Sequence, residues 1–387
     1  MTDISDDSKY QEGLEEEVLE DEIDDDLDIN GSEESPKIEG QKKTGFIKQF
    51  VSSKQPFYKM SLPISYNEPR SLLEKFTDMG LFLDIFLKTP TVESEEQRFL
   101  EILKFYLSGW IQQKETKNPF NPIIGEVHTC KWEHADSCTE YIAEQISHHP
   151  PSSAFCFYNT EKGVILHSYL SPTSKFWGNS FESSMEGKIV FEIPSLDEEY
   201  IVEAPKIVVK GVVVGSLQTE TIGSTNLVCK KTGYSAEIEF KGKGLFKNKT
   251  SMVAKVKHTS NKKSLYSLEG RWDGTVSITS TKSNDTTLFL DINSEGQKPI
   301  LPTEDQQEDN YSRKVWKHVI SKMLANNEDE AQNQKAMVEE TQRNLAKSRE
   351  AKQEKWVPVN FSKNSQDTFT FNKLSEARKE IISNLKK

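Results

Sequence analysis

The chain has 387 residues and a net charge of −12, and its 28% charged and 35% hydrophobic residues are typical of a folded protein with one large or two ordinary domains. It contains no run of roughly 18 or more apolar residues, so no transmembrane helix is expected, and the opening residues MTDISDDSKY lack the basic and apolar regions of a signal peptide. The four cysteines show no CxxC spacing, which argues against a metal site or a disulfide scaffold and predicts reduced thiols in the cytoplasm.

Residues 1–42 form an acidic tail. Positions 1–40 hold 17 Asp and Glu against 2 Lys, a balance of −15, which leaves the rest of the chain at about +3. A block of like charges cannot bury enough apolar surface to fold, so we expect a disordered tail. The functional alternative is an electrostatic brake that screens a basic face of the body. The mildly basic body itself suits an anionic membrane surface, and we expect no nucleic-acid partner.

The segment 43–60 has a helical pattern of apolar residues. Thr44 could cap this helix, and lysines flank the apolar side. One stripe of the helix would carry Phe46, Ile47, Phe50 and Val51. Two interpretations remain open here: a small helix docked on the core, or a movable flap that lies in a membrane interface.

The remainder, residues 61–387, divides into three parts by pattern. Residues 61–118 predict helices, one starting near Pro69 and one over 94–112. Residues 119–300 contain many short apolar runs separated by turn residues, which predicts a large antiparallel sheet or barrel. No internal repeat occurs, so a propeller is not expected.

The third part, residues 301–387, returns to helical patterns. Helices are predicted for "SRKVWKHVISKML" from Ser312, for the charged stretch 328–356, and for "SEARKEIISNLKK" at the end of the chain. The whole chain is therefore expected to be an α+β protein.

Two adjacent histidines, His148 and His149, precede two prolines in "EQISHHPP". Neighbouring residues of a plain strand face opposite sides, so the pair cannot chelate one metal, and neither HxH nor HExxH is present. A strand kinked by Pro150 and Pro151 at a sheet rim would let both rings reach one anion such as a phosphomonoester. The alternative is that one histidine caps the backbone and the other is exposed.

A charged stripe runs along the predicted C-terminal helix in "KAMVEETQRNLAKSR". Lys335, Glu339 and Arg343 are spaced by four residues and share one helical face. This pattern is typical of salt bridges within a helix. It equally describes a phosphate-binding edge in which Glu339 holds the two cations in place.

Together these stretches resemble the oxysterol-binding protein family of lipid-transfer proteins. "EQISHHPP" resembles the family fingerprint, "NPFNPIIGE" (118–126) precedes it at the family's spacing, and "GRWDG" (270–274) and "KAMVEETQR" (335–343) resemble two later motifs. The resemblance covers roughly residues 60–387. The chain is similar to short family members that consist of the lipid-binding domain alone.

The resemblance implies a large, nearly closed antiparallel β-barrel around a hydrophobic tunnel, with an N-terminal lid at 43–60 and helices at both ends. It implies a non-enzymatic protein without cofactor or metal. Such a protein exchanges phosphatidylinositol 4-phosphate for a sterol between Golgi and endoplasmic reticulum membranes, as a cytoplasmic and peripherally bound monomer. The headgroup site carried over from the family consists of His148, His149, Lys335, Glu339, Arg343 and Asn121.

One position departs from the family pattern. The family usually has a lysine directly before the first proline of the "PFNP" segment, whereas this chain has Asn118, with Lys117 one residue earlier. We expect Lys117 to compensate as a phosphate ligand.

Three further questions stay open at this point. The second lipid could be phosphatidylserine instead of a sterol, because "LPISYNEPRSLLEKFTD" is also similar to the phosphatidylserine-transferring branch. A sensor that binds lipid without transporting it is a further alternative. A phosphoinositide phosphatase is not favoured, because no nucleophile motif or metal cluster accompanies His148 and His149.

Overall fold

The computed structural model describes residues 64–110, 117–148, 150–211, 218–242, 251–291, 296–365 and 368–384. The chain divides into two units, Met1–Lys43 and Thr44–Lys387, and every described residue belongs to the second. The acidic tail, the segment 43–60 with Phe46, Ile47, Phe50 and Val51, and His149 lie outside the described residues. The expectations for them stay predictions.

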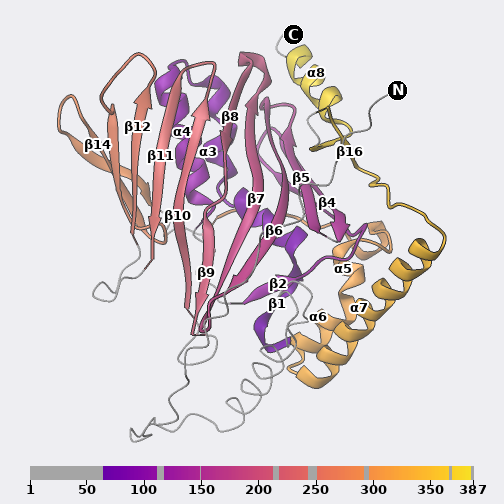
Figure 1. The fold of residues 1–387 in the computed structure, drawn as a ribbon. Coiled ribbons are helices and arrows are strands. Elements are labelled where there is room, and N and C mark those ends of the chain that lie inside the picture. The colour runs from indigo at the N-terminus through magenta and orange to yellow at the C-terminus, as the bar shows by residue number, and fades with distance from the viewer. Residues whose placement is uncertain are drawn as a thin grey trace, which may run out of the picture. The chain divides into compact units, whose positions relative to one another are not determined.

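A 13-stranded antiparallel sheet forms the wall of this second unit (Figure 1). The strands follow the order β15-β14-β13-β12-β11-β10-β8-β7-β6-β5-β4-β3, and β9 pairs with β7 and β10 beside this path. They are β3 Val127–Glu133, β4 Cys138–His148, β5 Pro151–Asn159, β6 Val164–Phe176, β7 Ser180–Ile193, β8 Glu198–Val202, β9 Lys206–Lys210, β10 Gln218–Cys229, β11 Tyr234–Lys241, β12 Ser251–His258, β13 Tyr266–Gly270, β14 Thr275–Ser280 and β15 Thr286–Asp291.

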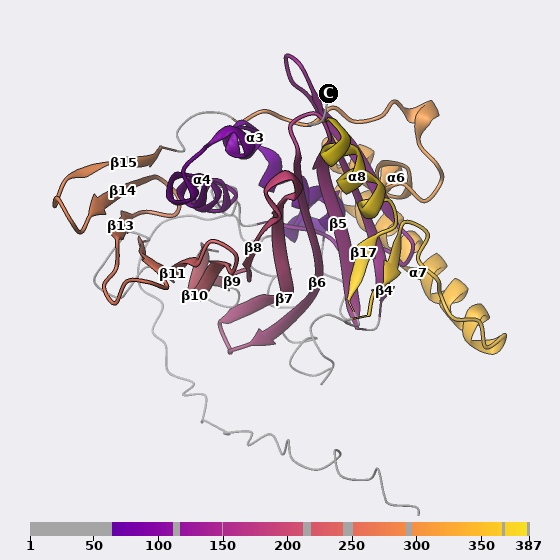
Figure 2. The same ribbon diagram turned by 90° about the horizontal axis from the view of Figure 1, so that it is seen from above.

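The sheet curves around helices that lie on its concave side, as Figure 2 shows for α3 and α4. Within the described residues, the end strands β3 and β15 do not pair with each other, so hydrogen bonds do not close the curved sheet into a complete barrel. This arrangement confirms the predicted fold class.

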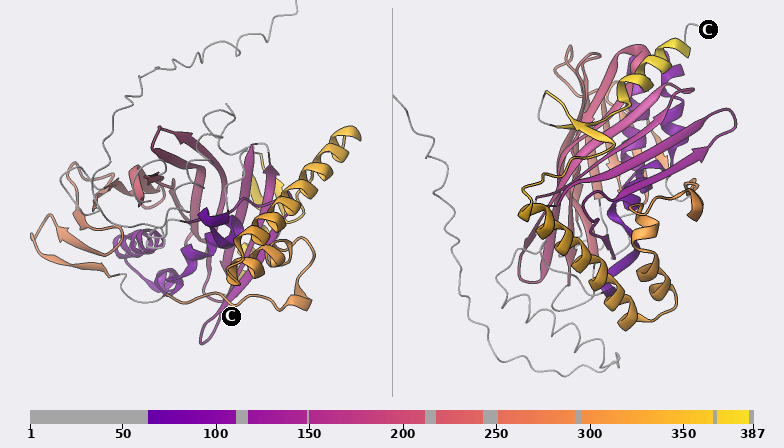
Figure 3. Two further views of the ribbon diagram at one scale, coloured as in Figure 1. Left: turned by 90° about the horizontal axis from the view of Figure 1, so that it is seen from below. Right: turned by 90° about the vertical axis from the view of Figure 1, so that its right-hand side faces the viewer.

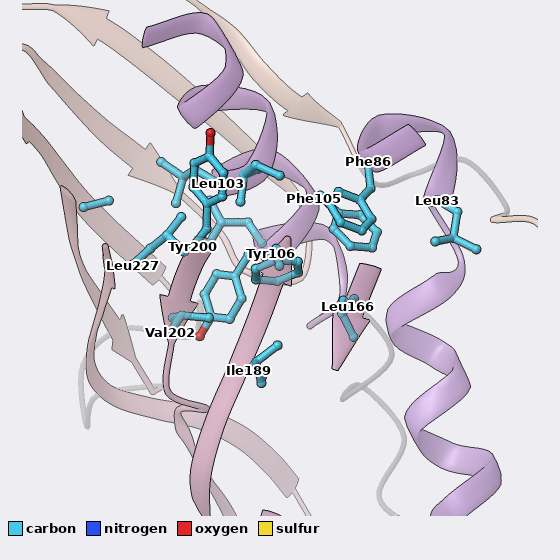
Figure 4. Packing of buried hydrophobic residues seen from close by; sticks show 14 of the residues in the cluster. Leu83, Phe86, Leu103, Phe105, Tyr106, Leu166, Ile189, Tyr200, Val202 and Leu227 are labelled. Atoms are coloured by element: carbon cyan, nitrogen blue, oxygen red, sulfur yellow. The ribbon is translucent and has the colours of Figure 1, made fainter. Parts of the chain in front are cut away.

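The helices inside the sheet are α2 Leu72–Lys75, α3 Leu83–Leu87 and α4 Glu95–Ser108. Ser94 caps α4 by accepting a hydrogen bond from the Gln97 amide, and two glutamates follow in the first turn. The predicted apolar face of α4 is buried: Leu103 and Tyr106 pack among Tyr200, Val202 and Leu227 of the sheet (Figure 4). The helices thus fill much of the interior and leave the remaining space to a cavity.

The helix expected to start near Pro69 begins later. Pro69 lies in β1 (Asn67–Ser71), which pairs in parallel with β2 (Asn118–Phe120) as a separate two-stranded sheet. Proline is tolerated on such an edge because it needs to donate no ladder hydrogen bond. Ser71 then caps α2 through its hydroxyl, which accepts from the Leu73 amide, so the helix starts at Leu72.

The C-terminal part contains the three predicted helical stretches and one hairpin that the sequence did not predict. The helices are α5 Ser312–Val315, α6 Lys317–Leu324, α7 Glu328–Ala351 and α8 Leu374–Asn384. The hairpin consists of β16 Phe361–Lys363 and β17 Phe369–Phe371. Figure 3 shows α7 crossing the lower end of β4 to β6, with α8 higher on the outer face of the sheet. Among the described helices, none is long and apolar enough to cross a bilayer.

Candidate functional site

A cavity of about 290 Å³ lies between the inner helices and the sheet. Much of its lining is apolar and comes from α2 and the turn after it, the segment that follows α4, and strands β6, β7 and β9: Leu72, Phe76, Met79, Trp110, Leu170, Phe181, Met185, Ile189, Ile207 and Val209. The other part of the lining is polar and is built by the β2 segment, the β4–β5 connection and α7: Lys117, Asn118, Asn121, Gln145, His148, Lys335 and Glu339. One cavity therefore offers both an apolar compartment and a set of cations and hydrogen-bonding groups.

In the described part of the "EQISHHPP" stretch, β4 ends at His148, Pro150 is a turn residue and β5 begins at Pro151. His148 is paired with Pro151 across the antiparallel ladder, so Pro150 lies in the turn and Pro151 begins the next strand, whereas one strand kinked by both prolines was predicted. The ladder also contains a bulge, because Gln145 pairs with Ser153 while Ser147 pairs with Ser152.

This bulge decides which way His148 faces. In a regular strand, residues three apart point to opposite sides of the sheet, yet both Gln145 and His148 line the cavity. The extra residue, Ile146, is buried in the cluster on the outer face and shifts the alternation by one position. No pattern in the sequence predicts this bulge.

Glu144, which opens the same fingerprint, serves the outer face. Its carboxylate is fully buried and accepts hydrogen bonds from the backbone amides of Val359 at 2.8 Å and Asn360 at 2.7 Å. These bonds fix the C-terminal segment just before β16, whose Phe361 packs on the outer face. The fingerprint glutamate is therefore a structural residue, and its role was missed by sequence reasoning.

Lys335 and Glu339 are brought together on α7 at the cavity. The Lys335 ammonium is only 4% exposed and lies 2.8 Å from Glu339 Oε1. Removing an ammonium from water costs several kcal/mol unless an opposite charge compensates. A buried lysine therefore needs a negatively charged group close to its ammonium. Glu339 supplies such an anion, and both residues line the cavity.

Arg343 is placed differently from the predicted stripe. Its guanidinium is 54% exposed and pairs with Glu340 at 2.8 Å, and it does not line the cavity. The expectation that Glu339 holds both cations was therefore wrong in this structure, because the i, i+3 partner Glu340 competes for Arg343. Its assignment to the headgroup stays a prediction.

The three residues of the β2 segment all reach the cavity. These residues are Lys117, Asn118 and Asn121. Lys117 and Asn121 are exposed, and Asn118 is half-buried. The backbone of this segment is held by Asn67, whose side-chain amide donates to the carbonyls of Asn118 at 3.2 Å and Pro119 at 3.3 Å. Lys117 is thus positioned at the cavity beside the asparagine that departs from the family pattern.

A further cation, Lys75 at the end of α2, also lines the cavity and was missed by sequence reasoning. Its ammonium lies 3.0 Å from an Asp78 oxygen and 3.6 Å from a Glu68 oxygen. Only the fold places this lysine near the β2 segment, since it is about 40 residues away in the chain.

The motif "NPIIGE" ends in a buried carboxylate that organises the base of α6. Glu126 is fully buried and accepts from the Ile123 amide, the Ser312 hydroxyl at 2.7 Å and the Trp316 indole at 2.9 Å. Burial raises the pKa of Glu126, and these hydrogen bonds oppose the rise. The preceding glycine, Gly125, has φ +77°, a backbone conformation that other residues rarely adopt.

Gln342 is a second functional candidate that the sequence did not reveal. Its Oε1 accepts from the Ile124 amide at 2.9 Å, and its Nε2 lies 2.6 Å from His148 Nε2. It thereby links the "NPIIGE" segment, the fingerprint and α7. Within the described part of the chain, no group of three or more His, Cys, Asp and Glu residues is arranged to hold a metal ion.

Comparison with known proteins identifies the family. The family model described as oxysterol-binding protein matches residues 44–327. The chain is 65% identical to oxysterol-binding protein 10 of Dictyostelium discoideum, with 99% of this chain and 100% of that protein aligned. It is 36% identical to oxysterol-binding protein-related protein 8 of Homo sapiens, with 77% of this chain aligned to 34% of the human protein.

Solved structures share the fold. The Osh1 ORD domain in complex with cholesterol is similar with a TM-score of 0.72 and 23% identity, covering 86% of this chain and 87% of that one. The Osh3 ORD of Saccharomyces cerevisiae in complex with PI(4)P is similar with a TM-score of 0.69 and 20% identity, covering 88% and 92%. This chain belongs to the oxysterol-binding protein family.

Proposed function

We propose that this protein is a lipid-transfer protein that binds phosphatidylinositol 4-phosphate and a sterol in turn and exchanges them between membranes. The observation that carries the proposal is that Lys335 and His148 line the same cavity, and that the other walls of this cavity are largely apolar. The solved relatives add support, because one is described with cholesterol and another with PI(4)P.

The polar end of the cavity suits a phosphomonoester. Lys335 would provide a nearly buried ammonium, Lys117 a second positive charge, and His148 and Asn121 hydrogen bonds. A phosphate with several acceptor oxygens can engage such donors from different elements at once. His149 and Arg343 complete the proposed headgroup site.

The apolar end suits a sterol or acyl chains. Because both lipids would occupy the same cavity, binding of one would exclude the other, which is the property that an exchanger needs. Lys117 is proposed to take the place of the lysine that the family has at position 118.

The cellular setting is part of the same proposal. The protein would act as a cytoplasmic monomer, without enzymatic activity, at anionic surfaces of Golgi and endoplasmic reticulum membranes. The segment 43–60 would cover the loaded cavity and expose Phe46, Ile47, Phe50 and Val51 to the bilayer when the cavity is empty.

A transfer assay tests the function. Labelled sterol and labelled phosphatidylserine would each be moved between two liposome populations, with and without phosphatidylinositol 4-phosphate in the acceptor. We expect sterol transfer to accelerate with the phosphoinositide, and His148→Ala and Lys335→Ala to remove that acceleration. His318→Ala on α6 and Lys347→Ala on α7 are matched controls, because both side chains are exposed and outside the cavity lining.

The outcomes separate the alternatives. Faster transfer of phosphatidylserine than sterol under these conditions would replace the sterol by phosphatidylserine as the second cargo. Stoichiometric phosphoinositide binding without transfer of either lipid would contradict the exchanger and favour a sensor.

A further inference from the structure

The Gln342 side chain stands directly behind His148. Gln342 is only 7% exposed and does not line the cavity, whereas His148 does. Its amide lies between two partners: the Ile124 backbone N–H, 2.9 Å from Oε1, and the His148 ring, whose Nε2 lies 2.6 Å from Gln342 Nε2. Gln342 therefore contacts His148 at the Nε2 edge of the ring, while His148 itself lines the cavity.

These two contacts define where the protons are. A backbone N–H can only donate, so the amide atom that faces Ile124 must be the oxygen, and the NH₂ group must face His148. An amide nitrogen can also only donate, so His148 Nε2 must be the acceptor. A ring that accepts at Nε2 is neutral and carries its proton on Nδ1.

We infer that Gln342 is a positioning residue that holds His148 as the neutral Nδ1–H tautomer. The inference rests on the proposed function and deepens it. His148 would contribute an uncharged ring to the phosphomonoester site and not a positive charge. Formation of the imidazolium would place protons on both nitrogens and break the bond to Gln342.

The charge that attracts the phosphate then comes from other elements. The ionisable groups that share the cavity with His148 are Lys335 and Glu339 of α7, Lys117 before β2, and Lys75 and Asp78 near α2. Arg343, next to Gln342 in sequence, is paired with Glu340. Among these described groups the lysines supply the charge, so the site binds phosphate over a pH range in which a histidine cation would be lost.

Gln342→Glu and Gln342→Met test this inference. A carboxylate at this position would accept from Nε2–H and favour the imidazolium, whereas methionine removes both hydrogen bonds at similar volume. Gln332→Glu is a matched control, because Gln332 lies on the same helix and its Oε1 likewise accepts a backbone N–H, that of Ile64 at 2.8 Å.

The first readout is the tautomer itself. In ¹⁵N-histidine-labelled protein, long-range ¹H–¹⁵N spectra distinguish a protonated Nδ1 from a protonated Nε2, and His148→Gln assigns the signal. We expect the Nδ1–H tautomer in the wild type and in Gln332→Glu, and the imidazolium in Gln342→Glu.

The second readout is binding to phosphatidylcholine vesicles that contain phosphatidylinositol 4-phosphate. Gln342→Met should weaken binding about tenfold, the equivalent of one hydrogen bond to a charged group. For Gln342→Glu, the affinity relative to the wild type should fall by at least about threefold from about pH 6 to about pH 8, because the extra positive charge is lost on deprotonation. Dividing the affinity of the variant by that of the wild type at each pH cancels the effect of the titration of the lipid phosphate, which both proteins share.

Two failures are distinguishable. A wild-type protein that binds these vesicles through His148 but carries the proton on Nε2 would overturn the role of Gln342 and leave the proposed function intact. Equal pH profiles for Gln342→Glu and Gln332→Glu would do the same. A wild type without phosphoinositide-dependent binding would overturn both.

Discussion

Glu144 and His148 lie four residues apart on β4 and face opposite sides of the sheet. Glu144 binds the backbone of Val359 and Asn360 on the outer face, whereas His148 lines the cavity. Regular alternation would put both on one face, so the bulge at Ile146 makes the difference. A structural residue and a proposed ligand-binding residue thus share one short motif.

Insertion of one alanine between Ser152 and Ser153 would give Ile146 a partner across the ladder, remove the bulge and should therefore turn His148 away from the cavity. The loss of a hydrogen bond to a phosphate is worth about 1.5–3 kcal/mol, so binding to phosphoinositide vesicles should weaken by about 10- to 100-fold. Ile146→Val keeps the bulge and should bind normally, at a cost in unfolding free energy of about 1 kcal/mol. Normal binding by a folded insertion variant would show that the bulge does not orient the ring.

Glu144→Gln should loosen the C-terminal segment without changing the cavity. The backbone amide of Val359 or Asn360 would then face the side-chain NH₂ group of the glutamine, which cannot accept its hydrogen bond. The free energy of unfolding should therefore fall by about 2 kcal/mol, and proteases should cleave earlier near β16. Glu161→Gln, at an exposed turn, is the control. Unchanged denaturation midpoints in both variants would argue against a structural role for Glu144.

Docking of α8 should depend on acid pH through Glu192. Burial alone would raise the pKa of Glu192, but hydrogen bonds from His167 and Arg378 lower it to about 2. Because the folded pKa lies below the usual value of 4.5, this stability is fully present above about pH 4.5 and is lost as the pH falls towards 2.

Urea denaturation at several pH values measures this contribution. Between about pH 5 and about pH 2.5 the wild type should lose about 2 kcal/mol more than Glu192→Gln, a figure reduced for the partial exposure of Arg378. Parallel curves for the two proteins would contradict the assignment.

Gly125→Ala should combine backbone strain with a clash. Gly125 has φ +77°, and a Cβ atom there would lie 2.4 Å from the Trp356 ring. The expected loss of about 3 kcal/mol adds about 1–2 kcal/mol of left-handed strain to an overpacking cost. Gly178→Ala is matched, because Gly178 has φ +72° with nothing within 4 Å, and it should lose only the strain.

The contribution of Trp356 can be isolated by a double-mutant cycle. Trp356→Ala should recover the overpacking part of the loss in Gly125→Ala and nothing in Gly178→Ala. Equal losses of unfolding free energy in the two glycine variants would mean that the Trp356 ring moves away from the added Cβ atom without destabilising the protein.

The sequence identified the fold through its motifs, but local geometry could not be predicted to the same depth. The helical face of α4 follows from periodicity, because Phe99, Ile102, Leu103 and Tyr106 recur at helical spacing and are all buried. The bulge at Ile146 has no such signal, since alternation in "EQISHHPP" reads equally well without it.

Side-chain partners were the least predictable part of the site. Lys335 and Glu339 form the ion pair that their spacing predicts. Arg343 pairs with Glu340, although helical spacing would equally allow Glu339. The role of Lys75 depends on a cavity that it shares with residues more than 40 positions away, and the role of Gln342 depends on a contact with a residue more than 190 positions away. No local pattern carries such information.

The central claim is that one cavity holds phosphatidylinositol 4-phosphate or a sterol, but not both. Native mass spectrometry tests it directly: the protein is loaded with the phosphoinositide and then titrated with sterol. We predict that the phosphoinositide complex is replaced by the sterol complex at a ratio of one to one, and that Lys335→Ala loads sterol alone. A ternary species with both lipids bound, or unchanged phosphoinositide loading of Lys335→Ala, would contradict the account.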